Sequence, residues 1–331
     1  PEPLSCRIII VHEHLNRMKR VFLLLGAALA LVPDVSLAAN TRARLVLPVG
    51  TVRPGETILA GVELSSDPGW HTYWWNPGES GMATEIHWNL PEGVTAGDIQ
   101  WPVPEYYDAG GLVTYVLHDT SVLLVPLSFS QQMAPGPVEI EAEVSWLECQ
   151  IQCLPGDATV RASVTVGDKS EPSADAALIA RARAALPESG SALGLQAAWE
   201  GPAKGDERRI LMEWPVSQPA TNVVFFPAPA TGFEILPQTE RLPVDASRVA
   251  LRLTVKKYDG DWPGTIRGVL RFEAGGARRA YEVQADLADA DATPAAPAPL
   301  APSRPGGLLY YLLLALGGGL ILNLMPCVLP I

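Results

Sequence analysis

Two cysteines separated by three residues, Cys149 and Cys153, have the clearest capacity for chemistry in this chain. Two thiols this close in sequence can cycle between a dithiol and a disulfide and exchange with the thiols of another protein. The 331 residues include four cysteines, and only this pair lies between the apolar segments near the two ends of the chain. A secreted scaffold held by disulfides carries more cysteines, spread over longer loops. The pair therefore favours a redox site over a structural crosslink.

The spacing also constrains the backbone. In an extended strand the two α-carbons would lie about 13 Å apart, beyond the roughly 4.4 to 6.8 Å that a disulfide spans. In a helical turn they would lie about 6 Å apart. If the pair is oxidised, we therefore expect the chain to turn after a strand ending at Trp146–Leu147, with Pro155–Gly156 ending that turn. Closing so small a ring stabilises a fold by only about 2 kcal/mol.

The residues next to the pair do not activate a thiol. Glu148 precedes Cys149, and the loop between the cysteines contains no Lys, Arg or His. A neighbouring carboxylate raises the pKa of a thiol and makes it a weaker nucleophile. The pattern indicates a disulfide that incoming thiolates attack rather than a general oxidant. No Cys-x-x-Cys motif of the thioredoxin type occurs in the chain.

A different chemistry is compatible with the same cysteines. Two thiolates can bind Cu(I), with a histidine as a third ligand. The candidate histidines are His71, His87 and His118, and the sequence does not place any of them near the sulfurs. A histidine among aromatic residues, as His71 is, more often packs in a core than binds a metal. A Cu(I)-binding module remains the alternative to a redox site that needs no cofactor.

Each end of the chain carries an apolar segment. Met18-Lys19-Arg20 precedes the short apolar run Val21–Val32 and small residues before Ala39, a pattern typical of a secretory signal peptide. A short membrane anchor is the alternative, although the run is too short to span a bilayer well. The other segment, Leu308–Ile331, has 24 uncharged positions and is long enough to form a transmembrane helix.

Cys327 lies inside this second apolar segment, between Pro326 and Pro330. A proline in a spanning helix removes backbone hydrogen bonds and is tolerated where neighbouring protein satisfies the freed groups. A thiol at this depth either packs as a small apolar group or exchanges with another cysteine. The flanking prolines favour exchange.

The chain between these ends is predicted to be mainly β. Val138–Trp146 alternates strictly between apolar and polar residues, as a half-buried strand does. Further strands are expected at residues 209–214, 222–226, 248–255, 265–272 and 281–285, and Pro/Gly-rich turns separate the strands at intervals typical of a sandwich. A helix is expected from Ser173, as its N-cap, to about Leu186. The formal net charge of −12 argues against nucleic acid or an anionic membrane surface as a partner.

Four stretches of sequence, one of them running from Trp88 to Pro102, resemble a known family. GGLILNLMPCVLPI at residues 318–331 resembles the first transmembrane helix of the DsbD family of membrane thiol reductases, which includes the ScsB branch. GWHTYWWNPGESG at 69–81 and the Trp-Leu-x-Cys-x-x-x-Cys-x-Pro motif at 146–155 resemble the N-terminal periplasmic domain of ScsB-type relatives.

The resemblance implies a membrane protein-disulfide reductase. Cys149 and Cys153 would receive electrons from a thioredoxin-like domain of the same full-length protein and pass them to periplasmic thioredoxin-fold or peroxiredoxin-like substrates. Cys327 would relay electrons from cytoplasmic thioredoxin through the inner membrane. Glu105–Asp108 is the best positional candidate for the aromatic loop that covers the disulfide in the DsbD branch. This makes Tyr106 and Tyr107 cap candidates, although paired tyrosines in a turn often only pack, and Trp146 is expected beside the site.

The implied fold is two immunoglobulin-like β-sandwich domains joined by a short helix and followed by a transmembrane helix. The expected segments are upstream residues with the signal peptide, a redox domain, a helical linker, a second sandwich, a Pro/Ala-rich linker and the start of the membrane domain. Their boundaries are 1–38, 39–168, 169–190, 191–287, 288–306 and 307–331.

Overall fold

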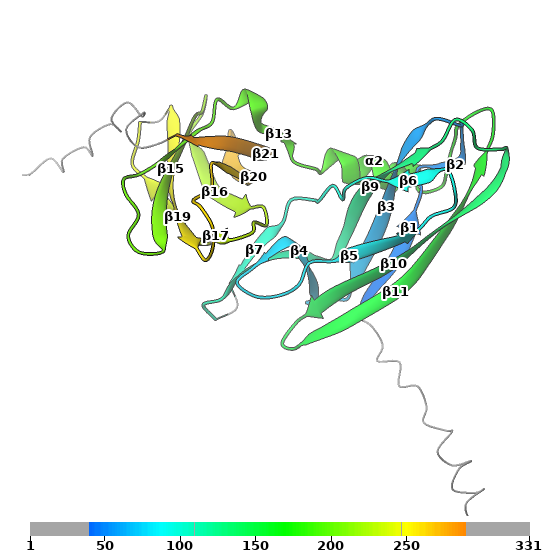
Figure 1. Cartoon of the computed structure of the whole chain (residues 1–331), viewed down its shortest axis with the longest axis horizontal. Coiled ribbons are helices and arrows are strands. Elements are labelled where there is room, and N and C mark those ends of the chain that lie inside the picture. Colours follow the sequence, from blue (N-terminus) through cyan, green and yellow to red (C-terminus); the bar gives the residue numbers. More distant parts are fainter. Residues whose placement is uncertain (1–39, 109, 246, 289–331) are drawn as a thin grey trace, which may run out of the picture. The chain divides into compact units, whose positions relative to one another are not determined.

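The computed structural model describes residues 40–108, 110–245 and 247–288, and these residues are mainly β (Figure 1). We call residues 41–172 the N-terminal β region and residues 188–288 the C-terminal β region. The strands of the N-terminal β region are β1 (Thr41–Val46), β2 (Val49–Val52), β3 (Thr57–Ser66), β4 (His71–Gly78), β5 (Glu85–Asn89), β6 (Val94–Ala96), β7 (Glu105–Asp108), β8 (Val113–His118), β9 (Thr120–Phe129), β10 (Gly136–Cys149), β11 (Cys153–Val166) and β12 (Glu171–Pro172).

The N-terminal β region contains two sheets with a shared apolar core. One sheet has the strand order β1-β3-β9-β6, and the other has the order β12-β2-β11-β10-β4-β8-β7 with β5 paired to β10. Val62 and Leu123 from the first sheet belong to the same buried cluster as Ile140 and Val144 from the second. This arrangement is consistent with the expected immunoglobulin-like sandwich.

The strand predicted at Val138–Trp146 is confirmed and is longer than expected. It forms part of β10, in which Ile140, Ala142 and Val144 are buried and the intervening glutamates point to the other face. β10 pairs with β11 in an unbroken antiparallel register that ends at Cys149 opposite Cys153. The alternation of apolar and polar residues therefore fixes which face of the hairpin covers the core.

The turn at the cysteines differs from the expected one. The strand does not end at Trp146–Leu147 but continues to Cys149, and a hairpin loop of residues 150–152 makes the turn. Pro155–Gly156 does not end the turn because it lies within β11, opposite Trp146–Leu147. A hairpin brings the cysteines together across two strands, whereas the expectation considered only distances along one local segment.

Helix α2 (Ala176–Ala184) follows the N-terminal β region, and its cap differs from the expected one. The N-cap is Asp175, because the Ser173 hydroxyl accepts from the backbone N–H of Asp175 and donates to the carbonyl of Leu47 instead. The expected apolar face is correct: Ile179 is buried against β1 and β9, with Leu178, Ala182 and Leu186 packed around it.

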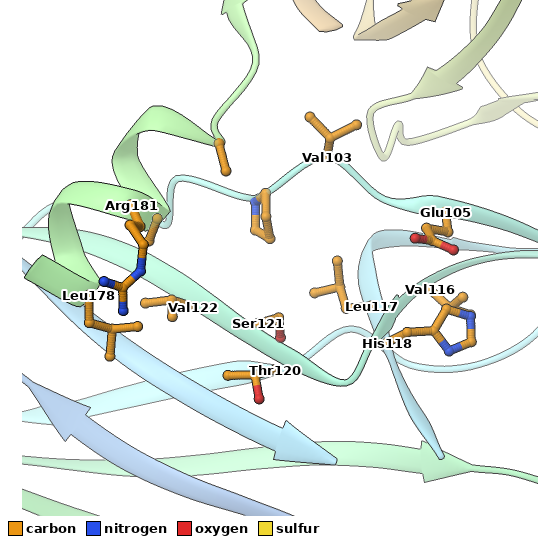
Figure 2. A pocket seen from close by; sticks show the side chains of 13 residues that line it. Val103, Glu105, Val116, Leu117, His118, Thr120, Ser121, Val122, Leu178 and Arg181 are labelled. Carbon is orange, nitrogen blue, oxygen red and sulfur yellow. The ribbon is translucent and has the colours of Figure 1, made fainter. Parts of the chain in front are cut away.

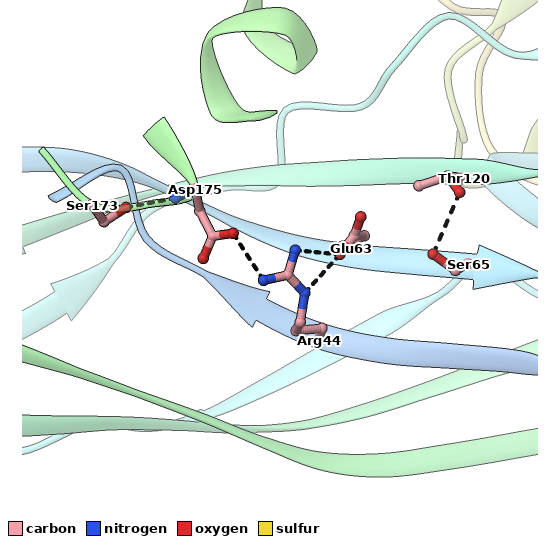
Figure 3. A network of polar contacts seen from close by, with 6 residues as sticks. All are labelled: Arg44, Glu63, Ser65, Thr120, Ser173 and Asp175. Carbon is pink, nitrogen blue, oxygen red and sulfur yellow. Dashed lines mark hydrogen bonds and ion pairs between the residues drawn. The ribbon is translucent and has the colours of Figure 1, made fainter. Parts of the chain in front are cut away.

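An exposed ion-pair network also connects the start of α2 to the sheet (Figure 3). Arg44 on β1 donates at 2.8 Å to Glu63 on β3 and at 2.8 Å to Asp175. Arg44 is about half exposed, and each such pair contributes no more than about 1 kcal/mol. The apolar contacts of Ile179 therefore hold the helix, and the network orients its first turn.

The C-terminal β region has its own strand set and its own buried cluster. Its elements are β13 (Glu188–Ser189), the 3-10 helix η1 (Gly190–Ala192), β14 (Gln196–Trp199), β15 (Glu207–Pro215), β16 (Ala220–Pro227), β17 (Phe233–Ile235), β18 (Glu240–Leu242), β19 (Arg248–Lys257), β20 (Thr265–Ala274) and β21 (Ala277–Ala288). The five strands predicted here lie within β15, β16, β19, β20 and β21.

The membrane-related expectations concern other parts of the chain. In the part of the chain that the structure describes, no helix is both long and apolar enough to cross a membrane. The predicted signal peptide, residues 289–306 of the Pro/Ala-rich linker and the apolar segment with Cys327 lie outside the described residues.

Gly156 tests the packing of the β10–β11 hairpin. A Cβ at this position would lie 2.6 Å from the indole of Trp146, so Gly156→Ala must displace a buried ring. We expect this variant to lower the free energy of unfolding by about 1 to 3 kcal/mol, measured by urea denaturation followed by tryptophan fluorescence. Gly50→Ala is the control, because no atom lies within 4 Å of its added Cβ. Equal stabilities of the two variants would contradict the packing.

Candidate functional site

The candidate site is a disulfide between Cys149 and Cys153 at the end of the β10–β11 hairpin. The two α-carbons face each other across the strands at 4.2 Å. The strand register itself brings the two cysteines together.

The two sulfurs are in different environments. Cys149 is 3% exposed and packs in a small cluster with Tyr73, Val116, Tyr107 and Leu147. Cys153 is exposed. A molecule that approaches from solvent therefore meets Cys153 before Cys149. The tip of the loop carries Ile151, which is 95% exposed and has an apolar side chain directly beside the disulfide.

The hydroxyl of Tyr73 contacts both sulfurs of the disulfide. It donates to Cys149 Sγ at 3.0 Å and lies 3.6 Å from Cys153 Sγ. Tyr73 belongs to β4 and is itself buried. Burial, followed by the neighbouring Tyr107, raises the pKa of Tyr73 above its usual value. The hydroxyl therefore stays protonated and acts as a hydrogen-bond donor.

Two of the three candidate histidines lie beside this cluster. The backbone of His71 pairs with Cys149 on one side and with His118 on the other. The His71 ring lies 5.4 Å from that of His118 and 5.0 Å from that of Tyr107, between centroids. His87 lies elsewhere, on β5, where it is exposed and pairs with Glu85.

The environment of His71 disfavours its charged form. Burial, followed by the neighbouring His118, lowers the pKa of His71 from 6.5 to about 4. At neutral pH the side chain next to Cys149 is therefore an uncharged imidazole. A fixed positive charge from His71 is absent from the site under these conditions.

The cap candidates lie in a strand rather than in the expected turn. Glu105–Asp108 forms β7, the last strand of its sheet among the described residues, and pairs with β8. Tyr107 faces the disulfide cluster, with its ring 6.0 Å from that of His118. Tyr106 alternates to the opposite face, where its ring lies 6.5 Å from that of Tyr115. Only one tyrosine of the pair is thus next to the site.

Trp146 and Glu148 lie on one face of β10, and the side chain of Cys149 lies on the opposite face. Trp146 is buried in the sandwich core, and its indole N–H donates to Glu148 at 3.2 Å. Glu148 is 2% exposed. Because neighbouring residues of a strand point to opposite faces, this carboxylate is not beside the Cys149 sulfur, as its position in the sequence suggested.

A cavity of about 310 Å³ lies next to the site, between β8 and helix α2 (Figure 2). His118 and Glu105 line it near β7, and Arg181 lines it on the helix. His118 is two strands away from Cys149, so their α-carbons are about 10 Å apart.

The sequence analysis did not single out Tyr73, and it considered His71 only as a Cu(I) ligand or a packed residue. Both lie in the run at residues 69–81 that carries part of the family resemblance. Tyr73 is 76 positions from Cys149, and only strand pairing brings the two together. With regard to Cu(I), the described residues contain no group of three or more His, Cys, Asp or Glu side chains arranged to hold a metal ion.

Comparisons with known proteins give a family match for part of the chain and a similar fold. A sequence model of the N-terminal domain of the thiol:disulfide interchange protein DsbD matches residues 42–165. The crystal structure of the N-terminal periplasmic domain of ScsB from Proteus mirabilis has a similar fold, with a TM-score of 0.54 and 18% sequence identity over 78% of this chain and 96% of that chain.

Another solved structure gives only a weak match. The C-terminal domain of the Streptococcus agalactiae AgI/II polypeptide BspA covers 74% of this chain and 100% of its own, at 10% identity and a TM-score of 0.15, and supports no conclusion. No curated protein sequence matches the chain.

The lowered pKa of His71 makes stability depend on pH. In the unfolded chain His71 binds a proton below about pH 6.5, whereas in the folded chain it binds one only near its pKa of about 4. The contribution of His71 to the free energy of unfolding is therefore fully present above pH 6.5. It is lost progressively as the pH falls toward 4, by up to about 3 kcal/mol. We expect His71→Phe to remove this part of the dependence in urea denaturation at a series of pH values. His87→Gln, a change at an exposed site, is the control and should keep the wild-type dependence of stability on pH. If His71→Phe also kept the wild-type dependence, His71 would not be its source.

Proposed function

We propose that this chain, whose residues 42–165 belong to the DsbD N-terminal domain family, carries out thiol–disulfide exchange at Cys149 and Cys153. The observation that carries the proposal is a disulfide at the end of a hairpin between a buried and an exposed cysteine, with a tyrosine hydroxyl donating to the sulfur of the buried one. A structural crosslink needs neither an accessible cysteine nor a hydrogen-bond donor to the sulfur of the buried one.

In the direction of reduction, the thiolate of a reduced partner attacks Cys153 Sγ. A bond forms between the partner sulfur and Cys153, the Cys149–Cys153 bond breaks, and its electron pair goes to Cys149 as a thiolate. A second thiolate of the partner then attacks the partner's own sulfur in this mixed disulfide and releases Cys153. The partner is oxidised to a disulfide, and the pair has gained two electrons. The reverse sequence passes these electrons to a substrate disulfide.

Tyr73 supports this choice of leaving group. A hydrogen bond to an anionic acceptor is roughly twice as strong as one to a neutral acceptor. The Tyr73 hydroxyl, 3.0 Å from Cys149 Sγ, therefore stabilises the thiolate that leaves more than it stabilises the disulfide. Because His71 is neutral at neutral pH, this hydrogen bond replaces the positive charge that activates many catalytic cysteines.

We further propose the finer organisation that the family suggests. Residues 39–168 and 191–287 form two immunoglobulin-like domains in the periplasm, joined by the helical segment 169–190. The full-length protein is a protein-disulfide reductase of the bacterial inner membrane, and Cys327, outside the described residues, relays electrons from cytoplasmic thioredoxin. A thioredoxin-like domain of the same protein reduces the Cys149–Cys153 pair, which then reduces periplasmic thioredoxin-fold or peroxiredoxin-like proteins.

Single-cysteine variants test the exchange and the point of attack. In a background in which Cys6 and Cys327 are Ser, Cys149→Ala leaves the exposed thiol and Cys153→Ala leaves the buried thiol. We expect Cys153 in the first variant to form a mixed disulfide with oxidised glutathione at least about tenfold faster than Cys149 in the second, measured by mass spectrometry. Faster reaction of Cys149 would reverse the assignment.

The same background with both cysteines intact gives the reduction potential of the pair. We expect a potential in the range of exchange proteins, roughly −120 to −270 mV, by equilibration with glutathione or dithiothreitol. A potential below about −300 mV would identify a structural disulfide and would exclude the proposed function.

The hydroxyl of Tyr73 can be removed without removing its ring. Tyr73→Phe loses a hydrogen bond to a charged acceptor, and we expect exchange with dithiothreitol to slow by about tenfold or more. The reduced form also loses more stabilisation than the disulfide, so the reduction potential should become more negative. Tyr281→Phe, which changes a ring packed on Phe272, is the matched control and should leave both quantities unchanged. An unchanged rate for Tyr73→Phe would remove Tyr73 from the mechanism.

A further inference from the structure

Strands β4, β7 and β8 have aromatic side chains on both faces. On one face, Tyr73 and Tyr107 belong to the cluster that contains Cys149. On the opposite face, Trp74 and Tyr115 belong to the sandwich core cluster, and each is 1% exposed. Because residues alternate between faces along a strand, any movement of these three strands moves the surroundings of the disulfide as well.

The C-terminal β region covers the second of these faces with Phe226 of β16. Phe226 is 0% exposed and belongs to the same buried cluster as Trp74 and Tyr115. Its ring centroid lies 5.3 Å from that of Tyr115 and 6.2 Å from that of Trp74, both in edge-to-face arrangements. Such contacts stabilise a particular relative orientation in addition to burying area.

Two hydrogen bonds accompany this ring. Arg271 of β20 donates from Nη1 to the carbonyl of Pro104 at 2.9 Å, and its guanidinium lies 5.0 Å from the centroid of Phe226. Pro104 directly precedes β7. Asn76, on β4, donates from Nδ2 to the carbonyl of Pro227 at 3.0 Å. The contacts thus reach the two strands that carry Tyr73 and Tyr107.

Arg271 is half-buried, and taking its charge partly out of water has a cost that its contacts must offset. Burial lowers the pKa of Arg271, so its charge is partly removed from water. A buried charge is tolerated when it is hydrogen-bonded and stacked. The bond to Pro104 and the face of Phe226 supply this compensation.

From these contacts we infer that Phe226 and Arg271 are positioning residues of the exchange site, and that the C-terminal β region holds β4 and β7 in the geometry that keeps Tyr73 and Tyr107 against Cys149. The inference rests on the exchange function proposed above. β7 pairs with a strand on one side only among the described residues, so it depends most on the support from Arg271.

The chain offers a matched pair of variants. Phe225 and Phe226 are neighbours on β16 and are both buried, but Phe225 faces the core of the C-terminal β region whereas Phe226 faces the N-terminal one. Phe226→Leu and Phe225→Leu make the same change in the same strand. Arg271→Met keeps the apolar stem and removes the donors to Pro104, and it provides a second variant if Phe226→Leu folds poorly.

Two readouts respond to positioning rather than to stability alone. The first is the rate of exchange with dithiothreitol, which we expect to fall about two- to tenfold in Phe226→Leu and in Arg271→Met. The second is the pKa of His71 by NMR titration in the oxidised chain, which should rise from about 4 toward 6.5 as water reaches the cluster. Phe225→Leu should lower the melting temperature but keep the wild-type rate and the wild-type His71 pKa.

The measurements distinguish failure of the positioning role from failure of the proposed exchange function. Wild-type values of both readouts in Phe226→Leu and Arg271→Met would overturn the positioning role, while exchange by the wild-type chain would leave the proposed function intact. Equal changes in Phe225→Leu and Phe226→Leu would also overturn it, because the effect would then reflect general destabilisation. If the wild-type chain fails to exchange, the proposed function fails, whereas a shifted His71 pKa still reports the structural coupling.

Discussion

The site depends on the continuous antiparallel register between β10 and β11. This register carries the apolar residues of β10 into the sandwich core and ends with Cys149 opposite Cys153 at an α-carbon separation of 4.2 Å. A shift by one residue would turn the core residues outward and separate the cysteines from each other. Burial of the core thus also holds the disulfide in place, and the short loop of residues 150–152 only has to close the hairpin.

Local patterns in the sequence predicted the strands well, because the alternation of apolar and polar side chains that marks a strand is visible in consecutive residues. The alternation at Val138–Trp146 gave the correct buried face, and the five strands expected in the C-terminal β region are all present. The cysteine pair was identified from its spacing. The hairpin at the pair was not, because its register depends on the whole length of β10 and β11 rather than on the residues next to the cysteines.

The rest of the site could not be predicted because it comes from strands far apart in the sequence. Tyr73 reaches Cys149 through the pairing of β4 with β10, and His71 meets His118 through the pairing of β4 with β8. Glu148 shows the reverse effect, since it is next to Cys149 in sequence but lies on the other face of the strand with Trp146. Glu148 was expected from its position in the sequence to raise the pKa of the Cys149 thiol, but the strand turns its side chain to the other face.

At neutral pH the Tyr73 hydroxyl and the uncharged imidazole of His71 lie beside the disulfide, and this determines what controls its reactivity. Where a nearby cation stabilises a thiolate, a small displacement changes the energy little, because charge interactions fall off slowly with distance. A hydrogen bond weakens steeply with distance and angle. Since Tyr73 supplies the donor at Cys149 and His71 is neutral, the reactivity of this pair depends on how firmly β4 is held. The packing behind β4, where Phe226 meets Trp74, is therefore as relevant to the chemistry as the residues that touch the sulfurs.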